Sequence, residues 1–190
     1  MMAVLNQDVD FFLLGLTNYA PDGYSKNAAK MGGYAGRIIY CWECLFDVDL
    51  SSIPAGSTIT AVTIDVNISD NNTGVAGVTL RVHEQNKNPW ADNGISIPKW
   101  ATAPNQASSA AWPTALSSVG PFTGTGLKTL PTSANLVSWF QTELDSGHTN
   151  NGLVLTYYNE YFAWWATVGD VDINVTYTAP SSQRRVMVIS

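Results

Sequence analysis

The stretch Cys-Trp-Glu-Cys at residues 41–44 comes closest to a chemical motif in this chain. Two cysteines separated by two residues occur in redox sites at helix starts and in structural zinc sites. A zinc site needs two further cysteine or histidine ligands at close spacing, but the two histidines, His83 and His148, are far from the cysteines and from each other. The element that carries Cys41 and Cys44 therefore decides what the motif can do.

Alternation of apolar and polar residues predicts that this element is a β-strand. The even positions from 38 to 50 are Ile38, Tyr40, Trp42, Cys44, Phe46, Val48 and Leu50. Residues i and i+3 of a strand lie about 10 Å apart and on opposite faces, whereas the α-carbons of a disulfide lie about 4.4 to 6.8 Å apart. We therefore expect Cys44 in the core, Cys41 on the other face, and no bond between them.

Neither histidine lies in a nucleophile signature such as Gly-x-Ser-x-Gly, so a Ser-His-Asp site is not indicated. We expect both His83 and His148 to be surface residues. The sequence predicts no catalytic residue and no cofactor.

Two pairs of carboxylates share a strand face at spacing i, i+2: Asp47 with Asp49, and Asp170 with Asp172. Such pairs could hold a hard cation at a sheet edge, or act as acid and base in a glycosidase. The simpler interpretation is that they are solvated, outward-facing carboxylates. We expect no metal site.

An aromatic stretch runs from residue 156 to residue 165. Neighbouring residues of a strand point to opposite faces, so adjacent aromatics there cannot all enter one core. Outward aromatic rings stack on sugars or anchor protein contacts, although loops or the helix could cover them instead. The candidate binding residues are Tyr157, Tyr158, Tyr161, Trp164 and Trp165.

The remaining patterns predict the elements around these residues. Residues 51–56 form a turn cluster, residues 62–69 alternate as a second strand, and residues 78–83 are its plausible hairpin partner. Residues 84–132 read as long loops with short strands. Residues 132–147 carry a helix capped by Thr132 or Ser133 and stopped by Gly147, and residues 152–158 and 168–178 alternate as closing strands. The predicted fold is all-β: a jelly-roll-like antiparallel β-sandwich with one short helix.

Composition narrows the class of partner. Of the 190 residues only 13% are charged, and the net charge is −6, so no basic stripe is available for nucleic acid. The first residues have neither the basic start of a signal peptide nor an apolar run long enough for a membrane span, so we expect no export by the usual route and no membrane. Three regions are expected: an N-terminal arm and first strand (1–21), the sandwich domain (22–178) and a C-terminal arm (179–190).

The segment Leu50–Gly56, Leu-Ser-Ser-Ile-Pro-Ala-Gly, with Ile59 and Thr60 after it, resembles the DNRLRE-type domains of bacteria and archaea. The Trp-containing loop after residue 88, the helix with its following Asn-Asn-Gly-Leu, and the last strand also look like that family. The resemblance spans about Asp22 to Thr178. It implies a β-sandwich module related to carbohydrate-binding modules.

A lone sandwich with short arms favours a bacteriophage virion protein over an exported module. We expect a non-enzymatic structural protein, a head-decoration (cement) or tail-associated component located in the virion, which docks on other virion proteins and forms a homo-oligomer. A C-terminal arm could add a strand to a neighbour. Its residues are Arg184, Arg185, Val186, Met187, Val188 and Ile189. The alternative is an extracellular carbohydrate-binding module that recognises cell-surface or matrix polysaccharide; a hydrolase is a weaker third possibility.

Overall fold

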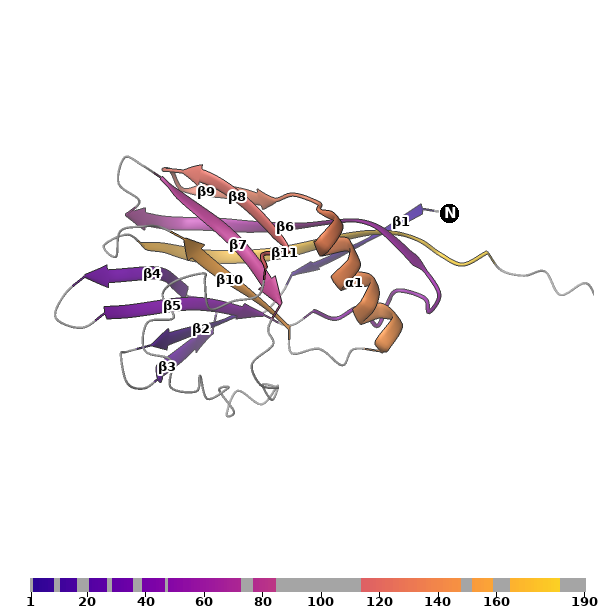
Figure 1. Ribbon diagram of the computed structural model, residues 1–190, viewed down its shortest axis with the longest axis horizontal. Coiled ribbons are helices and arrows are strands. Elements are labelled where there is room, and N and C mark those ends of the chain that lie inside the picture. The colour runs from indigo at the N-terminus through magenta and orange to yellow at the C-terminus, as the bar shows by residue number, and fades with distance from the viewer. Residues whose placement is uncertain are drawn as a thin grey trace, which may run out of the picture.

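A computed structural model gives the fold (Figure 1). It describes residues 2–8, 11–16, 21–26, 29–35, 39–46, 48–72, 77–84, 114–147, 152–158 and 165–181. Within these ranges, side chains are described for residues 2–7, 46, 48–70, 77–84, 114–147, 152–156 and 166–181. The described part has eleven strands and one helix. They are β1 (Met2–Asp8), β2 (Phe11–Leu16), β3 (Pro21–Lys26), β4 (Ala29–Ala35), β5 (Ile39–Phe46), β6 (Thr58–Asn72), β7 (Val78–Glu84), β8 (Ser117–Phe122), β9 (Gly126–Leu130), α1 (Ala134–Ser146), β10 (Leu153–Tyr158) and β11 (Trp165–Thr178).

The strands form two antiparallel layers, so the fold is the all-β sandwich that the sequence predicts. One layer contains the two longest strands, β6 and β11, with β9 beside β6 and β1 beside β11. The other layer runs β8, β7, β10, β5, and β5 also pairs with β2, which pairs with β3. β4 pairs with both β5 and β11 and joins the two layers.

Buried apolar residues of the paired strands β6 and β11 form one side of the core. The register sets Val62 opposite Val175, and the pairs Ile64–Ile173 and Val66–Val171 follow along the same two strands. All six side chains are fully buried, whereas Asp65 and Thr63 between them are only half-buried. Full burial of one such side chain stabilises the fold by about 1.5–3 kcal/mol. The alternation predicted for both strands is confirmed.

The strand predicted around the two cysteines is also confirmed. β5 ends at Phe46, but burial still alternates beyond it: Val48 and Leu50 are buried and Asp49 is exposed. The turn that follows is closed by Ile53 N–H donating to the carbonyl of Leu50 at 2.9 Å. The chain thus leaves the layer of β5, turns, and enters β6.

The predicted partner of β7 is wrong. Residues 78–83 were expected to form a hairpin with the strand over 62–69, but β7 pairs with β10 and β8, while β6 pairs with β11 and β9. β6 and β7 thus lie in different layers of the sandwich. Alternation identifies a strand and its buried face, but both layers bury one face against the same core, so it does not identify the neighbour.

Helix α1 closes one end of the sandwich (Figure 1). Of the two predicted caps, Ser133 is the one observed: its Oγ accepts from Leu136 N–H at 3.0 Å, and Gly147 ends the helix in a left-handed conformation. Leu136 and Phe140 are fully buried in the core. Gln141 fixes the helix to the start of β6, since its Oε1 accepts from Ile59 N–H at 2.8 Å.

Candidate functional site: an exposed sheet edge

The two cysteines lie on a strand in the interior of the sheet. On β5, Cys41 pairs with Leu16 and Gly33, and Cys44 pairs with Leu13 and Leu155. Hydrogen-bonded neighbours on both sides keep this segment extended, which places the two α-carbons about 10 Å apart. A disulfide between them is therefore excluded by the backbone.

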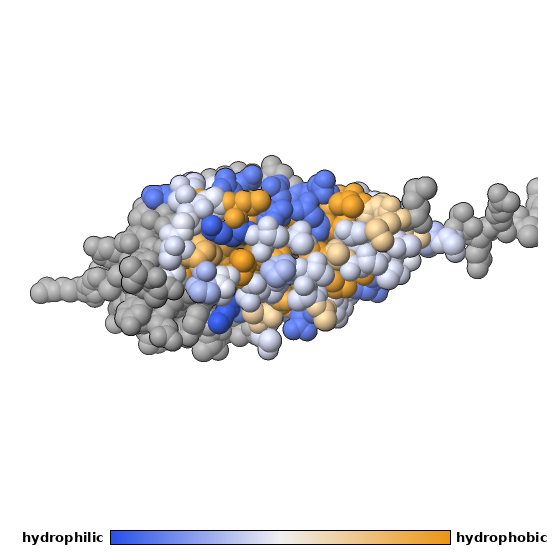
Figure 2. All heavy atoms as spheres, turned by 90° about the horizontal axis from the view of Figure 1, so that it is seen from above, coloured by the Kyte–Doolittle hydropathy of each residue, from blue (hydrophilic) through white to orange (hydrophobic). Residues whose placement is uncertain are grey.

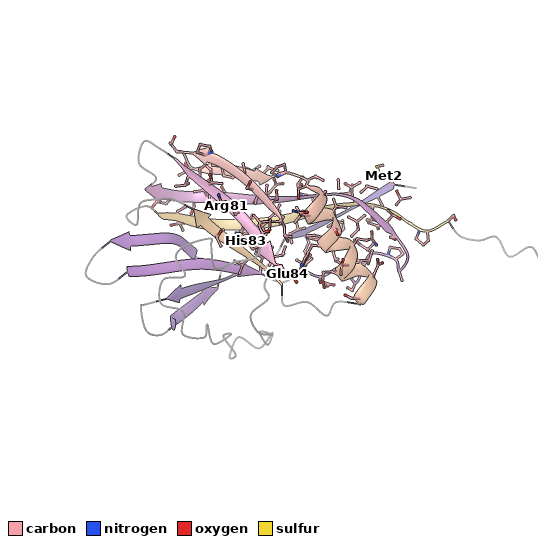
Figure 3. All side chains as sticks on the ribbon, in the orientation of Figure 1. Met2, Arg81, His83 and Glu84 are labelled. Atoms are coloured by element: carbon pink, nitrogen blue, oxygen red, sulfur yellow. The ribbon has the colours of Figure 1, made fainter. Side chains whose placement is uncertain are left out.

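His83 corrects the expectation of a surface histidine. Only 2% of it is exposed, and its Nε2 lies 3.1 Å from the Oγ1 of Thr156, which is itself 5% exposed. His83 lies on the side of β7 opposite to buried Val82, but that side is also covered at this point: on the neighbouring strand β10 every residue from Leu153 to Thr156 is buried. Figure 3 shows His83 on β7 between Arg81 and Glu84. The second histidine, His148, lies outside the described residues.

Three of the four carboxylates in the predicted pairs lie within the described residues. Asp49 and Asp170 are exposed, Asp172 is half-buried, and the side chain of Asp47 lies outside the described residues. Each of the two exposed carboxylates accepts from a nearby backbone N–H: Asp170 from Val171 at 3.1 Å, and Asp49 from Ser51 at 2.8 Å.

A third carboxylate, Asp65, faces Asp172 across β6 and β11 and is held by neutral donors. It accepts from Thr129 Oγ1 at 2.5 Å and from Asn174 Nδ2 at 3.0 Å. Within the described residues no group of three or more His, Cys, Asp or Glu side chains is arranged to hold a metal ion.

The predicted aromatic and arm residues are described only in part. The register sets Tyr157 opposite Leu80 and Tyr158 opposite Thr79, and Trp165 begins β11 opposite Gly32 and Asn72. The side chains of these three aromatics lie outside the described side chains. Entirely outside the described residues are Tyr161, Trp164, Arg184, Arg185, Val186, Met187, Val188 and Ile189.

The feature that the sequence interpretation missed is the edge of β1. This strand pairs with β11 along its whole length, from Met2 opposite Thr178 to Asp8 opposite Asp172, and it has no other strand partner among the described residues. A strand with one neighbour presents a row of backbone N–H and C=O groups on its other side. Among the described residues β1 therefore has an open edge, the kind of edge to which another strand can add.

The side chains of β1 make this edge apolar on one face. Met2 is 69% exposed and Val4 is 58% exposed, whereas Leu5, on the opposite face, packs against the core. Figure 3 places Met2 near one end of the molecule, far from His83. Figure 2 shows that the orange residues on the upper face of the described part are separate patches between pale and blue ones. On this face the exposed apolar residues therefore do not form one continuous patch.

The edge also lacks the usual protection against strand addition. Edge strands are commonly blunted by lysine, proline, bulges or inward charges, but Met2–Gln7 contains no charged residue, no proline and no glycine. The one charged residue of β1 is Asp8, at the end of the strand. β9, at the other edge of the same layer, has the exposed Leu127 but also Lys128 and a glycine, Gly126. The weak signal for β1 in the sequence was this uncharged stretch, which was interpreted as part of an N-terminal arm and first strand.

Comparison with known proteins adds no family. Neither a protein-family model nor a curated protein sequence matches this chain. The resemblance to DNRLRE-type domains therefore stays a prediction. No helix in the described part of the chain is long and apolar enough to cross a membrane.

Proposed function

We propose that this protein is a non-enzymatic structural protein of a virion, a head-decoration or tail-associated component that docks on other virion proteins. The observation that carries the proposal is the edge of β1, where Met2 and Val4 are exposed on a strand with a single described partner. An edge that is uncharged from Met2 to Gln7 and exposes apolar side chains favours association, because a new strand satisfies its backbone groups and covers its apolar surface.

The rest of the described part supports a scaffold. β6 and β11 bury one continuous apolar face, and α1 covers the end of the core. Two buried serines are bonded to backbone carbonyls: Ser57 donates to the carbonyl of Pro54 at 2.6 Å, and Ser117 to that of Pro131 at 2.7 Å. A rigid sandwich whose edge strand β1 exposes apolar side chains suits a protein that presents a fixed docking surface.

The experiment is incorporation into particles. The gene is deleted from the viral genome and supplied on a plasmid. Purified virions are then expected to contain the chain at a fixed copy number per particle, which quantitative mass spectrometry measures. Val4→Lys should reduce that copy number at least tenfold, because it places a charge on the docking edge. Leu127→Lys is the matched control, since Leu127 is 64% exposed on the other edge of the same layer. Particles that never contain the chain would overturn the proposal.

A second candidate function, a carbohydrate-binding module, is favoured by the outer face of β6 and β11. Side-chain hydroxyl, amide and carboxylate groups meet there, as in the bonds of Asp65 with Thr129 and Asn174. These groups are the kind that pair with sugar hydroxyls. The test is a polysaccharide array: binding lost with Asn174→Ala or Trp165→Ala but kept with Leu127→Ala would support a sugar site, and an array without binding would remove it.

A further inference from the structure

We propose that the edge of β1 accepts residues Val186–Ser190 of a second copy of this chain as an added antiparallel strand. This inference rests on the proposed function and names the occupant of the same edge. It joins two parts of the chain: an open strand with exposed apolar side chains, and an uncharged apolar segment that belongs to no described element. Strand addition to an open edge is a general mode of recognition.

The two segments match in length and pattern. With Val188 opposite Val4, the antiparallel register also pairs Met187 with Leu5 and Ser190 with Met2. Directly opposite residues of antiparallel strands lie on the same face, with Cβ atoms about 4.5–5.5 Å apart. Val188 would then cover Val4, which is 58% exposed in the single chain.

Charge selects the antiparallel direction. In this register Arg184 and Arg185 come to the end of β1 at which Gln7 lies. That end is acidic: the exposed Asp49 lies beside it, with its N–H donating to Gln7 Oε1 at 3.2 Å, and β1 ends with Asp8 at the register position of Asp172. A parallel strand with Val188 opposite Val4 would instead place both arginines beyond Met2, at the opposite end of β1 from Asp8.

The chain's own segment cannot reach this position. β11 ends at Thr178 opposite Met2, and the described chain continues away from β1, since Pro180 lies beside Gly56 in the turn before β6. From Ser181 to Arg185 an extended chain spans at most about 14 Å. The level of Gln7 lies about 17 Å back along β1 from Met2 alone. A second copy must therefore supply the strand.

Cysteine cross-linking between full-length chains tests the pairing. A chain with Val4→Cys is mixed with a chain with Val188→Cys, oxidised, and analysed by peptide mass spectrometry, which separates the new disulfide from any bond of Cys41 or Cys44. The 4–188 cross-link is expected to exceed by at least tenfold the 127–188 cross-link of a matched mixture with Leu127→Cys. Arg184→Glu with Arg185→Glu should weaken self-association at least tenfold in sedimentation velocity.

Three outcomes would overturn the inference. One is no excess of the 4–188 product over the control. Another is a dominant 4–4 product, which would mean that two β1 edges pair with each other. The third is a 4–188 bond within single chains of the double variant at high dilution. If the chain is monomeric while Val4→Lys still removes it from particles, the second-copy inference fails and the proposed function stands.

Discussion

The Nε2 atom of His83 lies 3.1 Å from the Oγ1 of Thr156, diagonally across the neighbouring strands β7 and β10. Both residues lie on the face opposite to the core pair Val82 and Leu155, yet both are buried. This polar contact therefore shows that the second face of β7 and β10 is covered where the two side chains meet. β10 has a strand neighbour on each side within the sheet, and both of its faces are covered from Leu153 to Thr156.

Replacing Thr156 by valine should lower the free energy of unfolding by about 1–3 kcal/mol, because the shape is kept while buried His83 loses one partner. Urea unfolding followed by tryptophan fluorescence measures the change. Thr58→Val, at an exposed position of β6, is the matched control and should stay within about 0.5 kcal/mol of the parent chain. Equal effects of the two substitutions would contradict a special role for the buried contact.

The sequence could predict local elements because their signals are local. The alternation along β6 and β11 depends only on which side chains enter the core, and the start of α1 depends on one hydroxyl at Ser133. Burial of His83 could not be predicted in this way, because it depends on what covers the second face of β10. The partner of β7 could not be predicted either, since any strand with the same alternation fits the same core.

The edge of β1 was missed for a related reason. β1 has four apolar residues in succession, Met2–Leu5, so its exposed and half-buried sides do not differ in polarity. Its place in the fold comes from pairing with the far end of the chain, at β11. Pairing over such a sequence separation is set by the whole sheet, and no local pattern records it.

Gly120 and Gly124 should respond very differently to alanine. A Cβ on Gly120 would lie 2.5 Å from the carbonyl oxygen of Val78, and its φ of 136° is one that side chains rarely adopt. A Cβ on Gly124 meets nothing within 4 Å. Gly120→Ala should therefore cost about 1–3 kcal/mol of stability from backbone strain, with the crowding adding to it.

Thermal unfolding by circular dichroism compares the two glycine variants. Gly124→Ala is the control and should leave the midpoint within a few degrees of the parent chain. A Gly120→Ala chain as stable as the Gly124→Ala chain would mean that β8 does not approach β7 as closely as the structure has it.

The cap of α1 gives a prediction with a built-in rescue. Ser133 both accepts from Leu136 N–H and donates to the carbonyl of Leu116, so it joins the helix to the segment before β8. Ser133→Ala should cost about 0.5–2 kcal/mol for the cap alone. Ser133→Thr keeps both functions and should recover most of the loss. Chemical unfolding of the three chains measures this, and a Ser133→Ala chain as stable as the parent would contradict the cap.

Cys41 and Cys44 are expected to remain free of a disulfide with each other. β5 has neighbours on both sides at this level, so bending it to bring the two thiols together would break pairing with β2 and β4. A disulfide needs α-carbons about 4.4–6.8 Å apart, against about 10 Å for positions i and i+3 of a strand. Freshly purified chain, unfolded in guanidinium with iodoacetamide and no reductant, should therefore gain two alkyl groups by intact mass. The same mass should appear after prior reduction.

A chain that takes up alkyl groups only after reduction, with a 41–44 linkage by peptide mapping, would show that this segment is not a paired strand. The bonding of β5 to its neighbours, and with it the path that joins the two layers, would then be wrong.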